Sequence, residues 1–177
     1  MPRRPRQLSF DDKSFFKTQD EFGGSTLKSN PKTTRPMDSK LPLHVVLRAK
    51  HSVFRLPTTY AYVNGLVHKI AKQNGIQIYK YANVGNHIHL AIRGVKPQIW
   101  ARFIRILTGT LALKLKKFLK ISEPFWNGRP YTRVVRSWKS AFQKVLRYID
   151  LNIIESEQNI SRALARKLQK IYFSNSC

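Results

Sequence analysis

The spacing of apolar residues between residues 43 and 136 switches between a period of two and a helical period, and this order constrains the fold most strongly. The pattern predicts strands at 43–48, 76–81, 87–93 and 131–136, and helices at 57–74 and 97–119. Strand, helix, strand, strand, helix, strand is the order of the ferredoxin-like fold. We therefore predict an α+β domain with an antiparallel sheet and both helices on one face.

The chain extends this unit at both ends. Two further helical patterns follow at 137–154 and 160–172. Residues 1–40 mix Pro, Gly, Ser and charged residues without a period, which predicts a flexible basic leader. The predicted organisation is thus this leader, a folded domain over 41–155 and a basic C-terminal helix over 156–177. Four aromatic residues leave open that part of the leader packs on the domain: Phe10, Phe15, Phe16 and Phe22.

The charge of the chain indicates a polyanionic partner. The sequence has 33 Lys and Arg against 9 Asp and Glu, a formal net charge of +24, and neither Asp nor Glu occurs between Asp38 and Glu123. Such a surface repels itself until a polyanion neutralises it, so we expect nucleic acid as the partner. A ribosomal-type binder and an anionic membrane surface are the alternatives. Against the membrane, the sequence offers no amphipathic anchor and no apolar run of about 20 residues.

Cysteine usage limits the chemistry. The single cysteine, Cys177, rules out a disulfide framework or a cysteine metal cluster within one chain. We expect a cytoplasmic protein associated with nucleic acid.

Two histidines define the first candidate site. His87 and His89 lie two apart on a predicted strand, so the pleat directs both imidazoles to one face. Two neutral imidazoles can bind a divalent ion, although such a pair on a strand can also be without a metal. A pair is an incomplete site, since hard ions also need oxygen ligands from elsewhere in the fold and from a substrate phosphate.

The predicted helix at 137–154 carries the second candidate site. Tyr148 and Asn152 are one turn apart, so a phenol and an amide oxygen share one helix face, which Lys144 joins one turn earlier. The alternative is structural: Tyr148 as a half-buried aromatic residue and Asn152 as a solvated residue near a helix end.

Three segments together resemble a known family. NVGNHIHL at 83–90, FWNGRPYTRVV at 125–135 and LRYIDLN at 146–152 resemble the single-tyrosine HUH transposases, in particular the REP-associated tyrosine transposases. The resemblance covers residues 41–155, which it identifies as an HUH transposase-like catalytic domain. It implies that Tyr148, on the appended helix, is the nucleophile. His87, His89 and Asn152 would bind Mg²⁺ or Mn²⁺.

The resemblance also implies an activity. The chain would be a transposase, a metal-dependent endonuclease and strand transferase that acts on single-stranded or hairpin DNA through a 5′-phosphotyrosine intermediate. A non-catalytic binder of hairpin nucleic acid is the alternative, and an RNA-binding protein of the same fold is a third. Monomer and homodimer both stay open. One departure is that Asn152 is followed by Ile-Ile-Glu-Ser and not by the proline and Ala-Gly pair common in the family.

Basic and aromatic side chains are candidates for DNA contacts. Basic residues on the strands and helices would bind the phosphate backbone, which gives affinity but no sequence preference: Arg48, Lys50, Arg93, Arg102, Arg105, Arg133, Arg136 and Lys144. Aromatic residues that could stack on exposed bases, or belong to the core, are Tyr79, Tyr81, Trp100, Trp126 and Tyr131.

Overall fold

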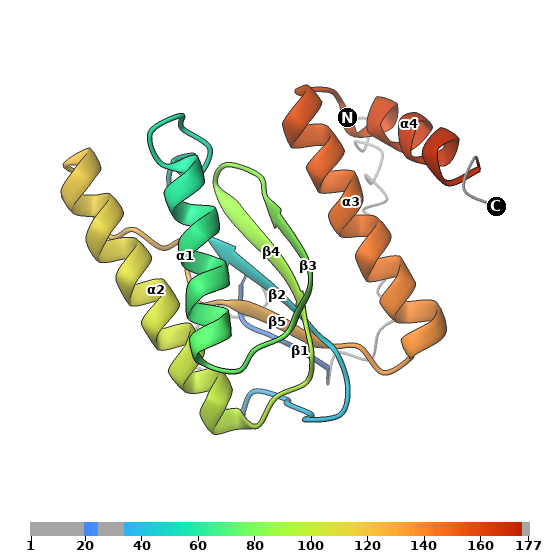
Figure 1. The fold of residues 1–177 in the computed structure, drawn as a ribbon, viewed down its shortest axis with the longest axis horizontal. Helices are drawn as coiled ribbons and strands as arrows, with labels where there is room; N and C mark the ends of the chain where they lie inside the picture. The colour runs from blue at the N-terminus through green and yellow to red at the C-terminus, as the bar shows by residue number, and fades with distance from the viewer. Residues whose placement is uncertain (1–19, 25–33, 175–177) are drawn as a thin grey trace, which may run out of the picture.

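The computed structural model describes residues 20–24 and 34–174 and contains one five-stranded antiparallel sheet (Figure 1). Its strands are β1 (Glu21–Phe22), β2 (Leu43–Arg48), β3 (Ile78–Asn83), β4 (His87–Ile92) and β5 (Tyr131–Val134). They lie in the order β1-β5-β2-β4-β3. The helices are α1 (Tyr60–Gln73), α2 (Pro97–Leu119), α3 (Gln143–Gln158) and α4 (Arg162–Ser174), with a π-helical turn, η4 (Trp138–Phe142), before α3.

Helices α1 and α2 cover one face of the sheet, and α3 lies on the other (Figure 1). The alternation along β2 and β4 explains this layering, because Val45, Leu47, Ile88 and Leu90 point to the α1 and α2 side and are fully buried. Strands β2, β3, β4 and β5 with α1 and α2 form the predicted ferredoxin-like unit. The predicted fold class is confirmed, including the appended helix α3.

The core between α2 and the sheet offers a direct test of this packing. Phe103 is fully buried, whereas Phe118 on the same helix is 61% exposed. We expect Phe103→Ala to lower the free energy of unfolding by about 3–5 kcal/mol, because the substitution removes apolar contacts and leaves a cavity. Phe118→Ala is the control and should change it by less than about 0.5 kcal/mol. Urea unfolding followed by circular dichroism measures both, and equal effects would contradict the described packing.

Strand β1 departs from the expected leader. Glu21 and Phe22 pair with Arg133 and Thr132 of β5, and the Phe22 side chain is buried. Arg35 holds this edge, since its Nη1 donates to the Pro130 carbonyl at 3.0 Å and its guanidinium lies 4.5 Å from the Phe22 ring centroid. Residues 21 and 22 of the expected leader thus form an edge strand, the outcome that its aromatic residues left open, although two residues are too few to show a strand period. Residues 1–19 and 25–33 of that leader, with Phe10, Phe15 and Phe16, lie outside the described residues.

The helix after β5 differs from the continuous helix expected at 137–154. It opens with the π turn η4, where the Ser137 hydroxyl accepts a bond from the Ser140 amide, and α3 then runs to Gln158. A π turn inserts one residue and so changes which face of the following helix meets the sheet. The helix continues past Asn152 because the next four residues include neither proline nor glycine. Asn159, with φ of 51°, ends it, and α4 starts only at Arg162.

Candidate active site

The face of the sheet toward α3 carries the predicted histidines. Register pairs His87 with Arg48, His89 with Val46 and Ala91 with His44, so these side chains share one face. Helix α3 is held over this face in part by an ion pair of 2.5 Å between Lys80 Nζ on β3 and Asp150 Oδ1 on α3. The two predicted half-sites, one on β4 and one on α3, therefore meet between the sheet and α3.

The aromatic rings of this site form one packed cluster. The ring centroids of His87 and His89 are 4.7 Å apart, and the Tyr148 ring stands nearly perpendicular to His89 at 5.5 Å. His44 on β2 joins them: its ring stacks on His89 at 5.6 Å with planes 8° apart and meets Tyr148 edge-on at 6.0 Å. Tyr148 is half-buried, while His44 and His89 are buried. Tyr148, His87 and His89 belong to the predicted site, whereas for His44 the sequence leaves open a supporting role near the site or a hydrogen-bonded place in the core.

Hydrogen bonds orient both imidazoles in the same way. His87 Nδ1 lies 2.5 Å from the Asn86 side-chain oxygen, which can only accept, so Nδ1 carries the proton and Nε2 the lone pair. His89 Nδ1 lies 3.4 Å from His44 Nε2. His89 Nε2 is completely buried and has no hydrogen-bond partner within the described part of the chain. An unpartnered buried nitrogen is costly in a folded protein unless it has a ligand, so this atom points to a metal.

Burial keeps the three imidazoles neutral. It is the main cause that lowers the pKa of His44 to about 3 and the pKa of His87 to about 4, and it holds the pKa of His89 well below 6.5. Nearby arginines lower these pKa values further: Arg133 for His44, Arg48 and Arg162 for His87, and Arg162 for His89. Neutral imidazoles are the form that binds metal ions.

The same pKa values predict a loss of stability in acid. In the unfolded chain a histidine takes up a proton near pH 6.5, whereas folded His44 does so only near pH 3, so between these values the unfolded state binds more protons. The free energy of unfolding is therefore highest above pH 6.5 and decreases as the pH falls toward 3. At pH 5 the contribution of His44 alone should lower the free energy of unfolding by about 2 kcal/mol. Urea unfolding at pH 7 and pH 5 measures this difference. His44→Phe should reduce it, and identical midpoints at both pH values would refute the prediction.

Asn152 completes the predicted set, and a residue outside that set contacts it. The Asn152 side chain is buried and its Nδ2 donates to the Tyr148 carbonyl at 2.7 Å. Its Oδ1 accepts from Arg162 Nη2 at 3.1 Å. An amide oxygen has two acceptor positions, so one remains for a metal. Arg162 lies at the start of α4, and its Nε donates to Glu155 Oε1 at 2.7 Å. Its guanidinium carbon lies 5.4 Å from the Tyr148 ring centroid.

The predicted metal ligands could bind a divalent ion, although they include neither a third histidine nor a cysteine or carboxylate. Within residues 20–24 and 34–174, three or more His, Cys, Asp or Glu do not gather where they could hold a metal. The candidate ligands are two imidazoles and one amide oxygen, from His87, His89 and Asn152. The burial of His89 Nε2, without a hydrogen-bond partner among the described residues, supports this assignment. Within the same ranges, helices of the length and apolarity needed to cross a membrane do not occur.

The predicted DNA-binding residues divide between the two faces. Arg48 and Arg133 are on the sheet face of the histidines, and Lys144 is exposed on α3. Arg102 and Arg105 are exposed on α2, which covers the opposite face (Figure 1). Lys50 and Arg136 are exposed and lie in ion pairs with Glu123 and Asp20, and Arg93 follows β4 at the end away from His87. The structure thus gathers only part of the predicted set around the histidines.

Comparisons with known proteins give the class of the chain. The family model described as Transposase IS200 like matches residues 38–152, and the chain belongs to this family. Its members are transposases, which are DNA-processing enzymes. The matched range begins before β2 and ends at Asn152, so it includes all four predicted site residues.

One solved structure shows the same fold. A REP-associated tyrosine transposase bound to a REP hairpin is 14% identical, with a TM-score of 0.51, over 69% of this chain and 72% of that one. A putative transposase from Deinococcus radiodurans R1 is 22% identical, with a TM-score of 0.45, over 69% of this chain and 98% of that one. A search among curated proteins finds no match. The resemblance to REP-associated tyrosine transposases is confirmed by the family and by the fold.

Proposed function

We propose that the chain is a single-tyrosine strand transferase that cuts single-stranded or hairpin DNA with Tyr148. The observation that carries the proposal is the packing of the Tyr148 ring against His89, whose buried Nε2 is without a hydrogen-bond partner among the described residues. A phenol packed on a neutral imidazole, with a second imidazole beside it and the Asn152 amide one helical turn along α3, would form a nucleophile next to a set of metal ligands. The protein of similar fold that binds a REP hairpin supports hairpin DNA as the substrate.

In the proposed reaction, Tyr148 Oη attacks a backbone phosphorus and loses its proton. The bond from phosphorus to the 3′ oxygen breaks, and the strand leaves with a 3′ hydroxyl. The other strand end is held as a 5′-phosphotyrosine, which conserves the ester bond, so a second 3′ hydroxyl can attack it and rejoin DNA. This is transesterification and consumes no water.

The surrounding residues have defined tasks in this proposal. When bound by His87, His89 and Asn152, Mg²⁺ or Mn²⁺ would polarise the phosphate and stabilise the departing 3′ oxygen. Arg162 presents a positive charge beside the Tyr148 ring, which attracts the phosphate. Arg48 and Arg133 extend the positive surface along the sheet.

The test is formation of a covalent adduct. Protein is incubated with Mn²⁺ and 3′-labelled hairpin DNA whose single-stranded flanks are randomised, then denatured and separated by electrophoresis. We expect label at the position of the protein, because the 5′-phosphotyrosine retains the 3′ portion of the strand, and no label with EDTA. Tight hairpin binding without an adduct would instead support a non-catalytic binder of the same fold.

A further inference from the structure

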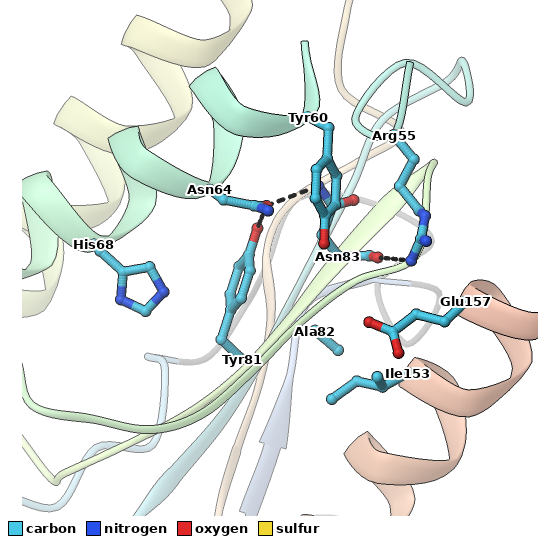
Figure 2. A pocket seen from close by; sticks show the side chains of 9 residues that line it. All are labelled: Arg55, Tyr60, Asn64, His68, Tyr81, Ala82, Asn83, Ile153 and Glu157. Carbon is cyan, nitrogen blue, oxygen red and sulfur yellow. Dashed lines mark hydrogen bonds between the residues drawn. The ribbon is translucent and has the colours of Figure 1, made fainter. Parts of the chain in front are cut away.

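A cleft of about 260 Å³ lies at the β3 edge of the sheet (Figure 2). Its walls come from α1, β3, α3 and the segment before α1, and its lining includes Arg55, Tyr60, Asn64, Tyr81, Ile153 and Glu157. It is outside the histidine cluster and has no part in the proposed chemistry. Figure 2 shows two tyrosine rings on one side and a carboxylate on the other.

Hydrogen bonds fix the polar side of the cleft. Asn64 Oδ1 accepts from the Tyr81 hydroxyl at 2.5 Å and from Asn83 Nδ2 at 3.1 Å. Because the oxygen is used for both bonds, the Asn64 amide nitrogen still offers its two protons to a ligand. His68, which also lines the cleft, meets the Tyr81 ring edge-on at 5.2 Å.

Arg55 makes the rim rigid. Its Nη1 donates to the Asn83 carbonyl at 3.1 Å and to the Ser156 hydroxyl of α3 at 2.9 Å. Its guanidinium lies 5.4 Å from the Tyr60 ring centroid. This contact holds the Tyr60 ring in place, although Tyr60 is 39% exposed. On the opposite side of the cleft, the Glu157 carboxylate of α3 offers a hydrogen-bond acceptor (Figure 2).

The cleft is close to the reacting centre. Ala82, which lines it, is the cross-strand partner of His89, and neighbouring strands lie about 4.8 Å apart. Ile153, which also lines it, follows Asn152 on α3. The tyrosines of the cleft lie on the α1 side of the sheet, so a DNA strand that passes from the histidines around the β3 edge can bring one of its bases to the cleft.

We propose that this cleft holds one unpaired base of the DNA strand, stacked on the rings of Tyr60 and Tyr81. The exocyclic amine of the base would donate to Glu157, and a ring nitrogen or carbonyl oxygen of the base would accept from the Asn64 amide. Aromatic side chains are the usual stacking platforms for unpaired bases, and a carboxylate accepts from an amino group. Thymine has no exocyclic amine, so the cleft should select against it at one position of the substrate. The inference rests on the proposed function, because it takes single-stranded DNA as the ligand.

The test uses binding without cleavage. Full-length protein with Tyr148→Phe is incubated with hairpin DNA whose single-stranded flanks are randomised, and the bound fraction is sequenced. We expect one flanking position to be depleted of thymine, and an abasic site there to weaken binding about tenfold in fluorescence anisotropy. Added Tyr60→Ala should remove this abasic penalty, and added Glu157→Gln should remove the discrimination against thymine.

Tyr62 provides the matched control, since it is 42% exposed on the same helix but does not line the cleft. Tyr62→Ala should leave the preference intact. A bound fraction without base preference at any flanking position would overturn the proposal. An equal loss of this preference in Tyr60→Ala and Tyr62→Ala would also overturn it. Absence of a covalent adduct from the unsubstituted protein, with the preference retained, would instead refute the proposed function and leave the base-binding cleft in place.

Discussion

Tyr148→Phe is expected to abolish the covalent protein–DNA adduct and to leave hairpin binding nearly unchanged. The substitution removes one oxygen, the proposed nucleophile, and keeps the ring that packs on His44 and His89. Since stacking and phosphate contacts account for affinity, the dissociation constant should change little. Electrophoresis under denaturing conditions measures the adduct, and fluorescence anisotropy measures binding.

Tyr131 gives a control within the same cluster. It is half-buried, and its ring meets His44 at 6.1 Å, yet we assign it no chemical task. Tyr131→Phe should form the adduct as the unsubstituted protein does. An adduct that persists in Tyr148→Phe would remove Tyr148 from the mechanism, and its loss in Tyr131→Phe would show that the cluster acts only as a structural unit.

His89→Ala should weaken Mn²⁺ binding by at least about 100-fold and eliminate the adduct. His89 Nε2 is the buried nitrogen without a hydrogen-bond partner in the described chain, so its removal takes away a proposed ligand. Even residues that merely orient metal ligands cost about 10–100-fold in affinity when replaced. Isothermal titration calorimetry with Mn²⁺ measures the effect directly, independently of any activity.

His51→Ala serves as the reference for this measurement, because His51 lies in a surface pair with Glu123 at 3.0 Å. It should bind Mn²⁺ as the unsubstituted protein does. Urea unfolding of both variants shows whether the His89 substitution has also disturbed the core. Unchanged Mn²⁺ affinity in a folded His89→Ala variant would refute the proposed metal site.

The sequence predicted those parts of the site that depend on local geometry. The strand pleat alone places His87 and His89 on one face, and the helical repeat alone places Tyr148 and Asn152 one turn apart. The meeting of these two half-sites came from the resemblance to the transposase family. The fold could be predicted for the same reason, since each core element has an apolar period long enough to recognise.

Long-range contacts account for the features that could not be predicted. The stacking of His44 on His89 depends on the register between β2 and β4, which periodicity within each strand does not determine. Arg162 reaches Asn152 across the turn between α3 and α4, and the spacing of ten residues follows no helical or strand repeat. Both side chains look ordinary in the sequence, as a strand histidine and one more basic residue.

The two-residue strand β1 has a consequence for shortened forms of the protein. It occupies the border of the sheet that β5 would otherwise present to solvent, and Arg35 fastens it there. A version trimmed to the family-matched domain would uncover the outer backbone groups of β5. Bare borders of this kind recruit strands from other molecules, so we expect the trimmed version to self-associate more readily than the full chain.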